Sequence, residues 1–220
     1  MSPYFFLFLL IILSYLLGAT PTSIVVGKYL QNIDIRDHGS GNAGATNVYR
    51  VLGLKPALFV VFVDVMKGWF PTAILAVYFF KIQSITDIGV IKILCGFSAV
   101  LGHSYTVFEG FKGGKGVATL GGMMIALFPS VFPFCLIVAI VIIVFTGYVS
   151  LASIIASCSL PILLFLLPPF TGLSPAPLST MVFSLLVPWF IIFTHRANIQ
   201  RLRDGTENKF ENAMIFRKGI

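Results

Sequence analysis

The sequence predicts an all-α protein that crosses a membrane several times. Hydrophobic residues make up 57% of the 220 positions and charged residues only 10%, whereas about a quarter of the residues in soluble domains are charged. The mean hydropathy is +0.97. The apolar runs are long enough to span about 30 Å of hydrocarbon as helices, and they lack the short alternating segments of membrane barrels. We therefore expect a single membrane-embedded domain over residues 1–220.

Seven apolar segments are candidates for membrane-spanning helices. They run roughly over residues 3–27, 56–80, 88–107, 117–129, 131–147, 150–168 and 178–194. Pro129 and Pro133 mark a tight turn between the fourth and fifth segments, because proline interrupts helices. These two segments are shorter than the ~20 residues of a perpendicular span, so we expect tilting or an incomplete crossing. No Lys or Arg precedes the first segment, which indicates a retained helix and not a cleaved signal peptide.

The basic residues predict the orientation of these helices. With seven spans, residues 28–55, 108–116, 147–150 and the tail after His195 lie on one face and hold 12 of the 15 Lys and Arg residues. Basic residues collect on the cytoplasmic side of membrane proteins. We therefore expect the N-terminus outside and the C-terminus in the cytoplasm. The net charge of +7 then reflects topology and not a nucleic-acid partner, because the basic residues do not gather on a soluble domain.

Three polar islands interrupt the apolar sequence, within residues 28–55, 108–116 and 195–220. Their central stretches read HGSGNAGATNVYR, GFKGGKG and HRANIQRLRDGTE. Glycines expose backbone N–H groups to anions, and charged side chains are rare at a membrane unless they are used. The islands therefore predict chemistry on phosphorylated groups at the lipid boundary.

The first island offers hydroxyl and amide groups to phosphate oxygens, together with Arg50, which can hold a phosphate bidentately. The other candidate binding residues are Ser40, Asn42, Gly44, Thr46 and Asn47. The alternative is a capped loop in which Thr46 begins a helix and Arg50 anchors it at the cytoplasmic face. The stretch also matches G-x-G-x-x-G, but its apolar surroundings exclude a nucleotide-binding βαβ unit.

The second island combines glycines, which allow close backbone approach, with lysines, which supply positive charge. Its candidate site residues are Lys112, Gly113, Gly114, Lys115 and Gly116. A helix that begins near Val117 would point its positive end at the same place. No Ser or Thr follows Lys115 to hold magnesium, so a nucleoside-triphosphate loop is disfavoured. The alternative is a turn whose lysines reach out to the membrane surface.

In the third island, His195, Asn198 and Arg201 or Arg203 have helical spacing just past the last span, so their side chains could face one pocket. The alternative is a basic helix that lies on anionic lipid head groups. Ser150 and Ser153 follow the fifth span on the same face. Either a ligand role or a hydrogen bond to the helix backbone fits these serines.

Few carboxylates are present, and Asp64 lies three positions before Lys67 inside the second span. This spacing predicts an ion pair within one helix, because isolated charges in a span are costly. No histidine has a carboxylate at the H-x-x-x-x-D spacing, so we expect no local His–Asp dyad, and we expect a structural hydrogen-bonding role for His103. The three cysteines lie in apolar segments without CxxC spacing, which supports neither a disulfide framework nor a zinc site, and we expect no metal.

The motifs GSGNAGATNVYR, GHSYTVFEGFKGGKGVAT and HRANIQRLRDGTE, in this order and separated by apolar spans, closely resemble the signature motifs of bacterial acyl-phosphate:glycerol-3-phosphate acyltransferases. The resemblance covers the whole chain. It implies a seven-helix enzyme of the bacterial inner membrane that moves an acyl group from acyl phosphate to glycerol 3-phosphate, giving lysophosphatidic acid and inorganic phosphate. It also implies that Ser40 and Arg50 are essential, that the glycines of the second motif bind glycerol 3-phosphate, and that His195 and Asn198 complete the site. No role is carried over to Glu109.

The residues fit this chemistry. Acyl phosphate is a mixed anhydride with a good leaving group, so orientation and charge neutralisation can suffice without a covalent nucleophile. Arg50, Lys112 and Lys115 can offset the repulsion between two phosphates. We therefore expect no cofactor, and we hypothesise that a substrate phosphate oxygen accepts the hydroxyl proton. The expected partners are acyl phosphate, glycerol 3-phosphate and membrane lipid, and a monomeric state is compatible with the sequence.

Two other classes of membrane protein would carry different sequence features. A transporter of organic phosphates or anions should show repeated halves with binding residues near the middle of the bilayer, and the sequence shows no convincing repeat. A CDP-alcohol phosphotransferase would need an acid-rich metal motif on a helix, which Asp64 and Lys67 do not supply. The transporter remains the alternative function.

Overall fold

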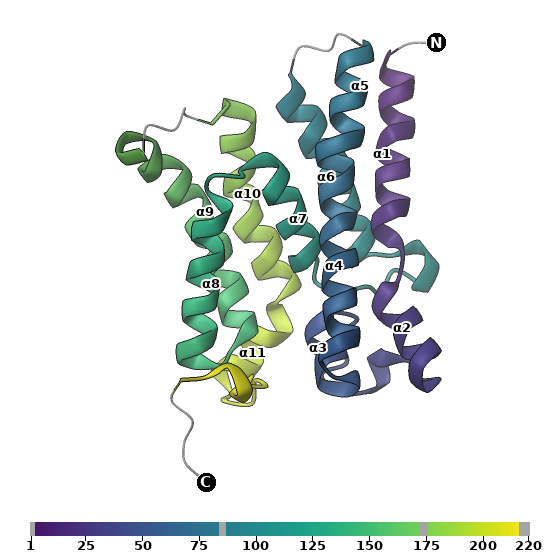
Figure 1. Cartoon of the computed structure of the whole chain (residues 1–220), viewed down its shortest axis with the longest axis vertical. Coiled ribbons are helices and arrows are strands. Elements are labelled where there is room, and N and C mark those ends of the chain that lie inside the picture. Colours follow the sequence, from purple (N-terminus) through teal and green to yellow (C-terminus); the bar gives the residue numbers. More distant parts are fainter. Residues whose placement is uncertain (1–2, 84–86, 172–175, 216–220) are drawn as a thin grey trace. The chain divides into compact units, whose positions relative to one another are not determined.

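The computed structural model describes residues 3–83, 87–171 and 176–215, and every regular element in these residues is helical (Figure 1). The all-α prediction is therefore confirmed. The chain divides into two compact units, Met1–Leu127 and Phe128–Ile220. All seven predicted apolar segments contain helices.

Unit 1 is built from long apolar helices joined by polar loops. Its α-helices are α1 (Pro3–Ala19), α2 (Thr22–Gln31), α3 (Ala45–Leu52), α4 (Leu54–Phe70), α5 (Ala76–Gln83), α6 (Ile88–Ser104) and α7 (Val117–Leu127). Its other turns are η1 (Ile35–Asp37), the π-helical η2 (Pro71–Leu75) and η3 (Val107–Glu109). Helix α1 packs on α6, and α4 packs on α7. Helices α2 and α3 lie at the end of the unit remote from the N-terminus (Figure 1).

The first apolar segment is not one continuous helix, contrary to the prediction over residues 3–27. Helix α1 ends at Ala19, and α2 begins at Thr22. Pro21 lies in this break with φ −86° and ψ 65°, and its ring leaves no backbone N–H for a helical hydrogen bond. The break brings two backbone carbonyls of the span into reach of other helices.

Small residues let the helices of unit 1 approach closely. A Cβ atom added to Gly68 of α4 would overlap with the carbonyl oxygen of Thr119 in α7. In the reverse direction, a Cβ atom on Gly122 of α7 would overlap with the carbonyl oxygen of Val65 in α4. Helices in membranes associate mainly through such close packing, because lipid is as apolar as the helix surface.

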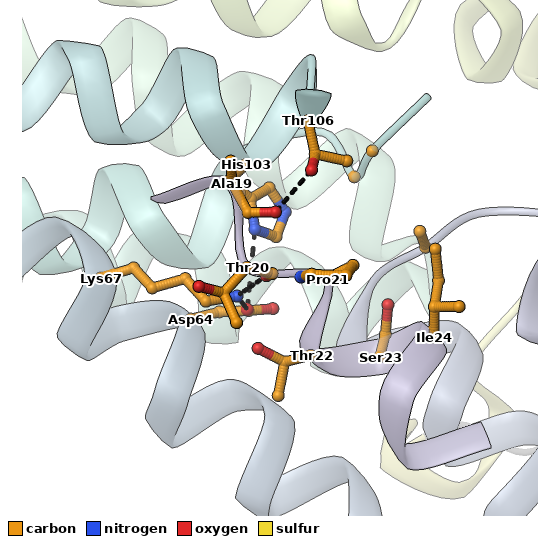
Figure 2. A pocket seen from close by; sticks show the side chains of 13 residues that line it. Ala19, Thr20, Pro21, Thr22, Ser23, Ile24, Asp64, Lys67, His103 and Thr106 are labelled. Carbon is orange, nitrogen blue, oxygen red and sulfur yellow. Dashed lines mark hydrogen bonds and ion pairs between the residues drawn. The ribbon is translucent and has the colours of Figure 1, made fainter. Parts of the chain in front are cut away.

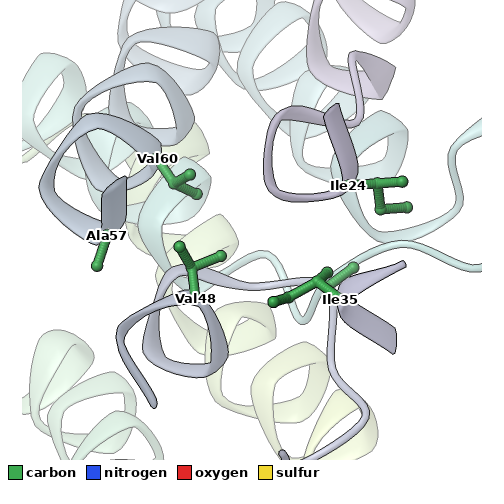
Figure 3. Packing of buried hydrophobic residues seen from close by; sticks show 6 residues of the cluster. Ile24, Ile35, Val48, Ala57 and Val60 are labelled. Carbon is green, nitrogen blue, oxygen red and sulfur yellow. The ribbon is translucent and has the colours of Figure 1, made fainter. Parts of the chain in front are cut away.

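A hydrophobic cluster lies beneath the polar end of unit 1 (Figure 3). It joins buried side chains from α2, η1, the loop before α3, and helices α3 and α4, namely Ile24, Ile35, Ala43, Val48, Ala57 and Val60. Burying such side chains stabilises the fold by about 1.5–3 kcal/mol for each large one. The cluster therefore fastens the first polar island to the start of α4.

Unit 2 contains α8 (Phe132–Thr146), α9 (Val149–Thr171), α10 (Leu178–Thr194), α11 (Arg196–Arg203) and the short η4 (Glu211–Ala213). Helix α9 packs against α8, α10 and α11. Helices α10 and α11 meet at an angle of 64°. The tail then returns to the end of α8, where the N–H of Phe210 donates to the carbonyl oxygen of Gly147 at 2.7 Å. This hydrogen bond fastens the third polar island to the loop before α9.

Several helices are long and apolar enough to cross a membrane. In the part of the chain that the structure describes these are Pro3–Gln31, Leu54–Lys81, Ile88–Glu109 and Val149–Pro168, and the bent pair α10–α11 makes a fifth. Helices α7 and α8 are apolar but shorter, as their segments predicted. The helices therefore support a multi-pass membrane protein, and the count of seven crossings stays a prediction.

Replacing Gly68 with alanine is expected to destabilise unit 1, because the new methyl group must push α7 away from α4. Forced overlap in a packed core typically costs about 1–3 kcal/mol. We expect a lower melting temperature in detergent, measured by thermal unfolding.

The matched control is Leu58→Ala on the same helix, since Leu58 is 58% exposed and its truncation should leave the melting temperature nearly unchanged. A Gly68→Ala variant that melts at the wild-type temperature would contradict the close approach of α4 and α7.

Candidate active site

The first polar island folds around the side chain of Asn47. Asn47 is only 1% exposed, and its Oδ1 accepts a hydrogen bond from the N–H of Ser40 at 2.7 Å. Its Nδ2 donates to the carbonyl oxygens of Ile35 and His38, both at 2.9 Å. Both amide hydrogens are thus used inside the protein. Asn47 thus holds the loop, and its predicted contact with a phosphate stays a prediction.

The remaining candidates of the first island lie on or near this loop. Ser40, Asn42 and Gly44 are half-buried in the loop, and Thr46 and Arg50 are half-buried on α3. Thr46 and Arg50 are four positions apart, so they share one face of the helix. Gly39 passes so close to Asn47 that a Cβ atom would overlap with Oδ1. The loop can therefore take this path only because residue 39 has no side chain.

The second polar island folds back onto the end of α6. The N–H groups of Gly113 and Gly114 donate to the carbonyl oxygens of Ser104 and His103, both at 3.1 Å. A Cβ atom on Gly113 would overlap with the carbonyl oxygen of His103, and one on Gly114 would overlap with its Nε2. The backbone at these two glycines therefore lies in close contact with the last residues of α6. Helix α7 begins at Val117, as predicted.

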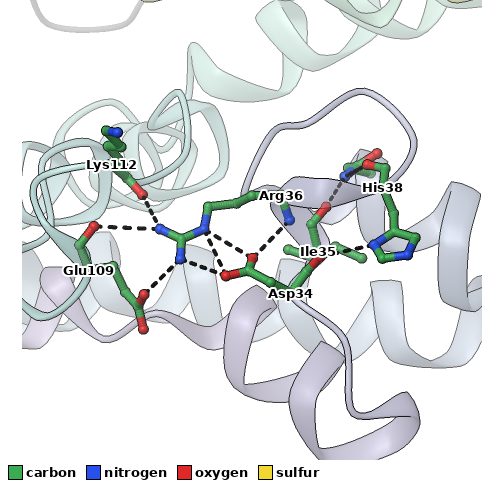
Figure 4. Close-up of polar contacts among 7 residues, drawn as sticks. Asp34, Ile35, Arg36, His38, Glu109 and Lys112 are labelled. Carbon is green, nitrogen blue, oxygen red and sulfur yellow. Dashed lines mark hydrogen bonds and ion pairs between the residues drawn. The ribbon is translucent and has the colours of Figure 1, made fainter.

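Arg36 joins the first island to the second (Figure 4). Its Nη2 lies 2.6 Å from Oδ2 of Asp34 and 2.9 Å from Oε2 of Glu109. The hydrogen bonds from Arg36 lower the pKa of Asp34 to about 2, so the contact stays ionic at neutral pH. The carbonyl oxygen of Lys112 also lies 3.5 Å from Nη1 of Arg36. Glu109, to which the sequence assigned no role, thus helps to tie the two islands together.

A charged cluster is buried beneath these loops (Figure 2). Nζ of Lys67 lies 2.7 Å from Oδ1 of Asp64, which confirms the predicted ion pair. Nδ1 of His103 lies 3.6 Å from the same oxygen. This contact is not the local dyad that the sequence excluded, because it joins two residues that are far apart in the sequence, one on α4 and one on α6. The structural role of His103 stays a prediction.

In unit 2 the carboxylate of Glu207 gathers the candidate residues. Its Oε1 accepts hydrogen bonds from Oγ of Ser150 at 2.8 Å and from Nδ2 of Asn198 at 2.6 Å. Its Oε2 accepts one from Nε of Arg201 at 2.7 Å. Two predicted site residues, Ser150 and Asn198, are therefore brought together through a third residue that the sequence had not singled out. Arg203 is exposed.

Glu207 is held in its ionised form. Burial raises its pKa, but the hydrogen bonds from Asn198, Ser150 and Arg201 outweigh burial, and the pKa lies below the ordinary value of 4.5. Ser153 behaves differently, because its hydroxyl donates to the carbonyl oxygen of Val149 in its own helix at 2.9 Å. Ser153 thus follows the backbone alternative, whereas Ser150 donates to Glu207 and its ligand role stays a prediction.

His195 lies at the bend between α10 and α11 and is 2% exposed. Its Nδ1 lies 2.8 Å from the carbonyl oxygen of Ile191. A carbonyl oxygen can only accept, so Nδ1 carries the hydrogen, and in the neutral ring Nε2 is then the acceptor. The bend therefore sets both the place and the tautomer of this ring.

Comparison with known proteins gives the family of the chain. The family described as glycerol-3-phosphate acyltransferase matches residues 8–205. A glycerol-3-phosphate acyltransferase of Chlorobium phaeovibrioides is 40% identical over 93% of this chain and 95% of the relative. That of Chlorobaculum parvum is 43% identical over 91% of this chain and 94% of its own length.

Solved structures agree with the sequence relatives. One match is the crystal structure of PlsY (YgiH), an integral membrane glycerol 3-phosphate acyltransferase, in its glycerol 3-phosphate form. Its sequence is 40% identical to this chain, the match covers 93% of this chain and 95% of that chain, and the TM-score is 0.80. The lysophosphatidic acid form of that protein matches with a TM-score of 0.78 and 39% identity. The chain therefore belongs to the glycerol-3-phosphate acyltransferase family.

Proposed function

We propose that this protein transfers an acyl group from acyl phosphate to the sn-1 hydroxyl of glycerol 3-phosphate, giving lysophosphatidic acid and inorganic phosphate for phospholipid synthesis. The observation that carries the proposal is the match, over nearly the whole chain, to an acyltransferase structure in a glycerol 3-phosphate form. The acyl-phosphate donor rests on the motif resemblance and on the chemistry of the site residues.

The same proposal places the chain in the bacterial cytoplasmic membrane with seven crossings, the N-terminus outside and all three polar islands in the cytoplasm. Its support is the charge distribution, since 12 of the 15 Lys and Arg residues fall in the islands and the loop at residues 147–150, and basic residues mark the cytoplasmic side. Within unit 1, the Arg36–Glu109 contact joins the first and second islands at one end. Within unit 2, the Phe210–Gly147 hydrogen bond joins the third island to the loop before α9.

Phosphate recognition is assigned to the loops of unit 1. Arg50, Lys112 and Lys115 supply cationic donors, which form the stronger class of hydrogen bonds to phosphate. Neutral donors come from the loop and from the glycine backbone, namely Ser40, Asn42, Gly44, Thr46, Gly113, Gly114 and Gly116. Of the acidic groups nearby, Asp34 and Glu109 share the guanidinium of Arg36, which offsets part of their charge.

In the proposed step the sn-1 hydroxyl oxygen attacks the carbonyl carbon of acyl phosphate, and the bond from that carbon to the phosphate oxygen breaks. Inorganic phosphate leaves, and a substrate phosphate oxygen takes the hydroxyl proton. Two basic side chains of unit 1 have partners inside the protein, and we assign neither the role of base. His103 is turned toward Asp64 and Gly114, and Lys67 donates to Asp64 and to the carbonyl oxygen of Thr20.

Ser150, His195 and Asn198 are proposed to act in the same reaction from unit 2. Asn198 and Ser150 share Glu207, and His195 is oriented by the carbonyl oxygen of Ile191. Glu207 is acidic and would repel a phosphate, so we assign it to positioning these donors and not to substrate contact. Metal and cofactor are not required by the proposed step.

The donor is tested with purified protein in lipid, supplied with labelled glycerol 3-phosphate and either acyl phosphate or acyl-CoA. We expect lysophosphatidic acid and one equivalent of inorganic phosphate with acyl phosphate only. Arg50→Ala should lower kcat/KM by at least about 100-fold, because a charge-assisted contact to the reacting phosphates is lost.

Sealed inverted membrane vesicles provide the control for orientation and for transport. Glycerol 3-phosphate added outside such vesicles reaches the cytoplasmic face, so product should form without uptake. Uptake of labelled phosphate ester without acylated product would instead identify a transporter, and activity with acyl-CoA alone would refute the donor.

Glu207→Ala is expected to lower kcat/KM by about 10- to 100-fold, because Asn198 and Ser150 lose the shared acceptor that holds them in place. Glu207→Gln should have a smaller effect, since an amide oxygen still accepts from both side chains and only the charge facing Arg201 is lost. Steady-state kinetics of the two variants measures this order.

The matched control for these kinetics is Asp204→Ala, which removes an exposed carboxylate from the same segment and should leave kcat/KM nearly unchanged.

The stabilising contribution of ionised Glu207 to the fold is present above its ordinary pKa of 4.5 and is lost as the pH falls through the lower pKa of the folded state. The difference in melting temperature between wild type and Glu207→Gln should therefore be largest near neutral pH and shrink in acid. A difference that grows in acid would contradict the ionic contact.

A further inference from the structure

Asp64 and Lys67 form an ion pair inside an apolar helix, with side chains that are 3% and 6% exposed. Such a pair is a poor way to stabilise a protein, because well-packed apolar residues of similar size are often at least as stable. Charged residues within membrane spans usually serve a function. The contacts of this pair indicate what that function is.

The pair first holds the break in the first span. Nζ of Lys67 donates to the carbonyl oxygen of Thr20 at 2.7 Å, and the hydroxyl of Thr106 donates to the carbonyl oxygen of Ala19. Both carbonyls lie at the end of α1, where helical hydrogen bonds stop, and that of Thr20 also accepts from the N–H of Thr22 at 3.0 Å. Lys67 and Thr106 add partners from other segments. The pair thus links α4 to the end of α1, and Thr106 links the second island to the same place.

The pair also faces the second island through His103. On one edge of the His103 ring, Nδ1 lies 3.6 Å from Oδ1 of Asp64. The other edge packs against Gly114, so closely that a Cβ atom added to Gly114 would overlap with Nε2 of the ring. The backbone of Gly113 and Gly114 is bonded to the last residues of α6. A continuous line of contacts therefore runs from the ion pair, through one ring, to the residues between Lys112 and Lys115.

The second island needs such support. Phe111 has a left-handed φ of 61°, which is unfavourable for a bulky residue and persists only where the surroundings enforce it. The Phe111 side chain is 60% exposed, so packing of its own ring contributes little. The N–H of Phe111 donates to the carbonyl oxygen of Thr106 at 2.8 Å. The shape of the loop therefore depends on its base, where Thr106, Gly113 and Gly114 meet the cluster.

The cavity beside the cluster is too small for a substrate. It measures about 10 Å³ and is lined by Asp64, Lys67, His103, Thr22 and their neighbours (Figure 2). This is room for about one water molecule, whereas ligand pockets measure about 300–1,000 Å³. Among the described residues the buried hydroxyl of Thr22 has no hydrogen-bond partner, which suits a water. The cluster does not touch substrate and acts through the loop.

We propose that Asp64, Lys67 and His103 are positioning residues that set the place of the loop at residues 110–116 and thereby the affinity for glycerol 3-phosphate. The proposal rests on the assignment of this loop to phosphate recognition. It predicts a selective effect, because the cluster supports one loop and not the whole site. KM for glycerol 3-phosphate should rise when the cluster is altered, while KM for acyl phosphate and kcat stay within about twofold.

The first test removes both charges together with Asp64→Leu/Lys67→Met. The double variant avoids leaving one buried charge alone, which would destabilise the fold for a trivial reason. We expect KM for glycerol 3-phosphate to rise about tenfold or more, since small displacements of positioning groups have large effects. Lys92→Met is the matched control, because it removes a charge near the other end of α6 and should leave every constant unchanged.

The second test is a double-mutant cycle between the ring and the loop, and it stays informative if the first variant does not fold. Gly114→Ala should raise KM for glycerol 3-phosphate because its methyl group strikes the His103 ring. In a His103→Ala background the same substitution should add clearly less, because the ring is gone and only the carbonyl oxygen of Ala43, 2.9 Å from the added Cβ atom, still resists it. If Gly114→Ala has the same effect in both backgrounds, the ring does not transmit the position of the cluster and the proposal is overturned.

Two further outcomes of these experiments test the proposal. An unchanged KM in a folded Asp64→Leu/Lys67→Met variant, or a loss confined to kcat, would overturn the positioning role even though the wild type acylates glycerol 3-phosphate. Failure of the proposed function would appear differently, because the wild type itself would form no product. Melting temperature and elution profile report folding in every variant.

Discussion

The ion pair between Asp64 and Lys67 is the interaction on which the polar end of unit 1 depends. Because both side chains are buried, neither charge could lie alone in an apolar helix without a large penalty. Lys67 also donates to the carbonyl oxygen of Thr20, and Asp64 lies near His103, so the pair on α4 contacts both the end of α1 and α6. The loop at residues 110–116 packs against His103, and in this way a buried contact can influence chemistry at the surface.

Carboxylates organise the polar end of each unit. Asp34 and Glu109 share the guanidinium of Arg36, and Glu207 gathers Ser150, Asn198 and Arg201. In each case the contact joins segments that are separate in the sequence. Arg36 and Arg201 offset part of this negative charge inside the protein, and the islands keep a basic excess that can act on anionic substrates. A chain with only eight acidic residues thus uses its carboxylates mainly for architecture.

Local patterns in the sequence predicted much of this structure, whereas contacts between distant segments could not be predicted. The apolar segments, the start of α7 at Val117 and the pair Asp64–Lys67 follow from composition and short spacing, because a helix places residues three apart on one face. The contact of His103 with Asp64 depends on how α4 and α6 pack. Asn47 looked like a phosphate donor because its amide is polar, but the path of the loop directs both hydrogens to backbone carbonyls. Glu207 could have been suspected, since charge close to an apolar span is rarely idle.

The most direct measurement of the central claim is hydrogen exchange at the amides of Gly113 and Gly114, which donate to Ser104 and His103. If the buried pair holds the loop, exchange at these two amides should be at least about tenfold faster in Asp64→Leu/Lys67→Met than in wild type, with α7 unchanged. Equal protection of the two amides in both proteins would contradict the account.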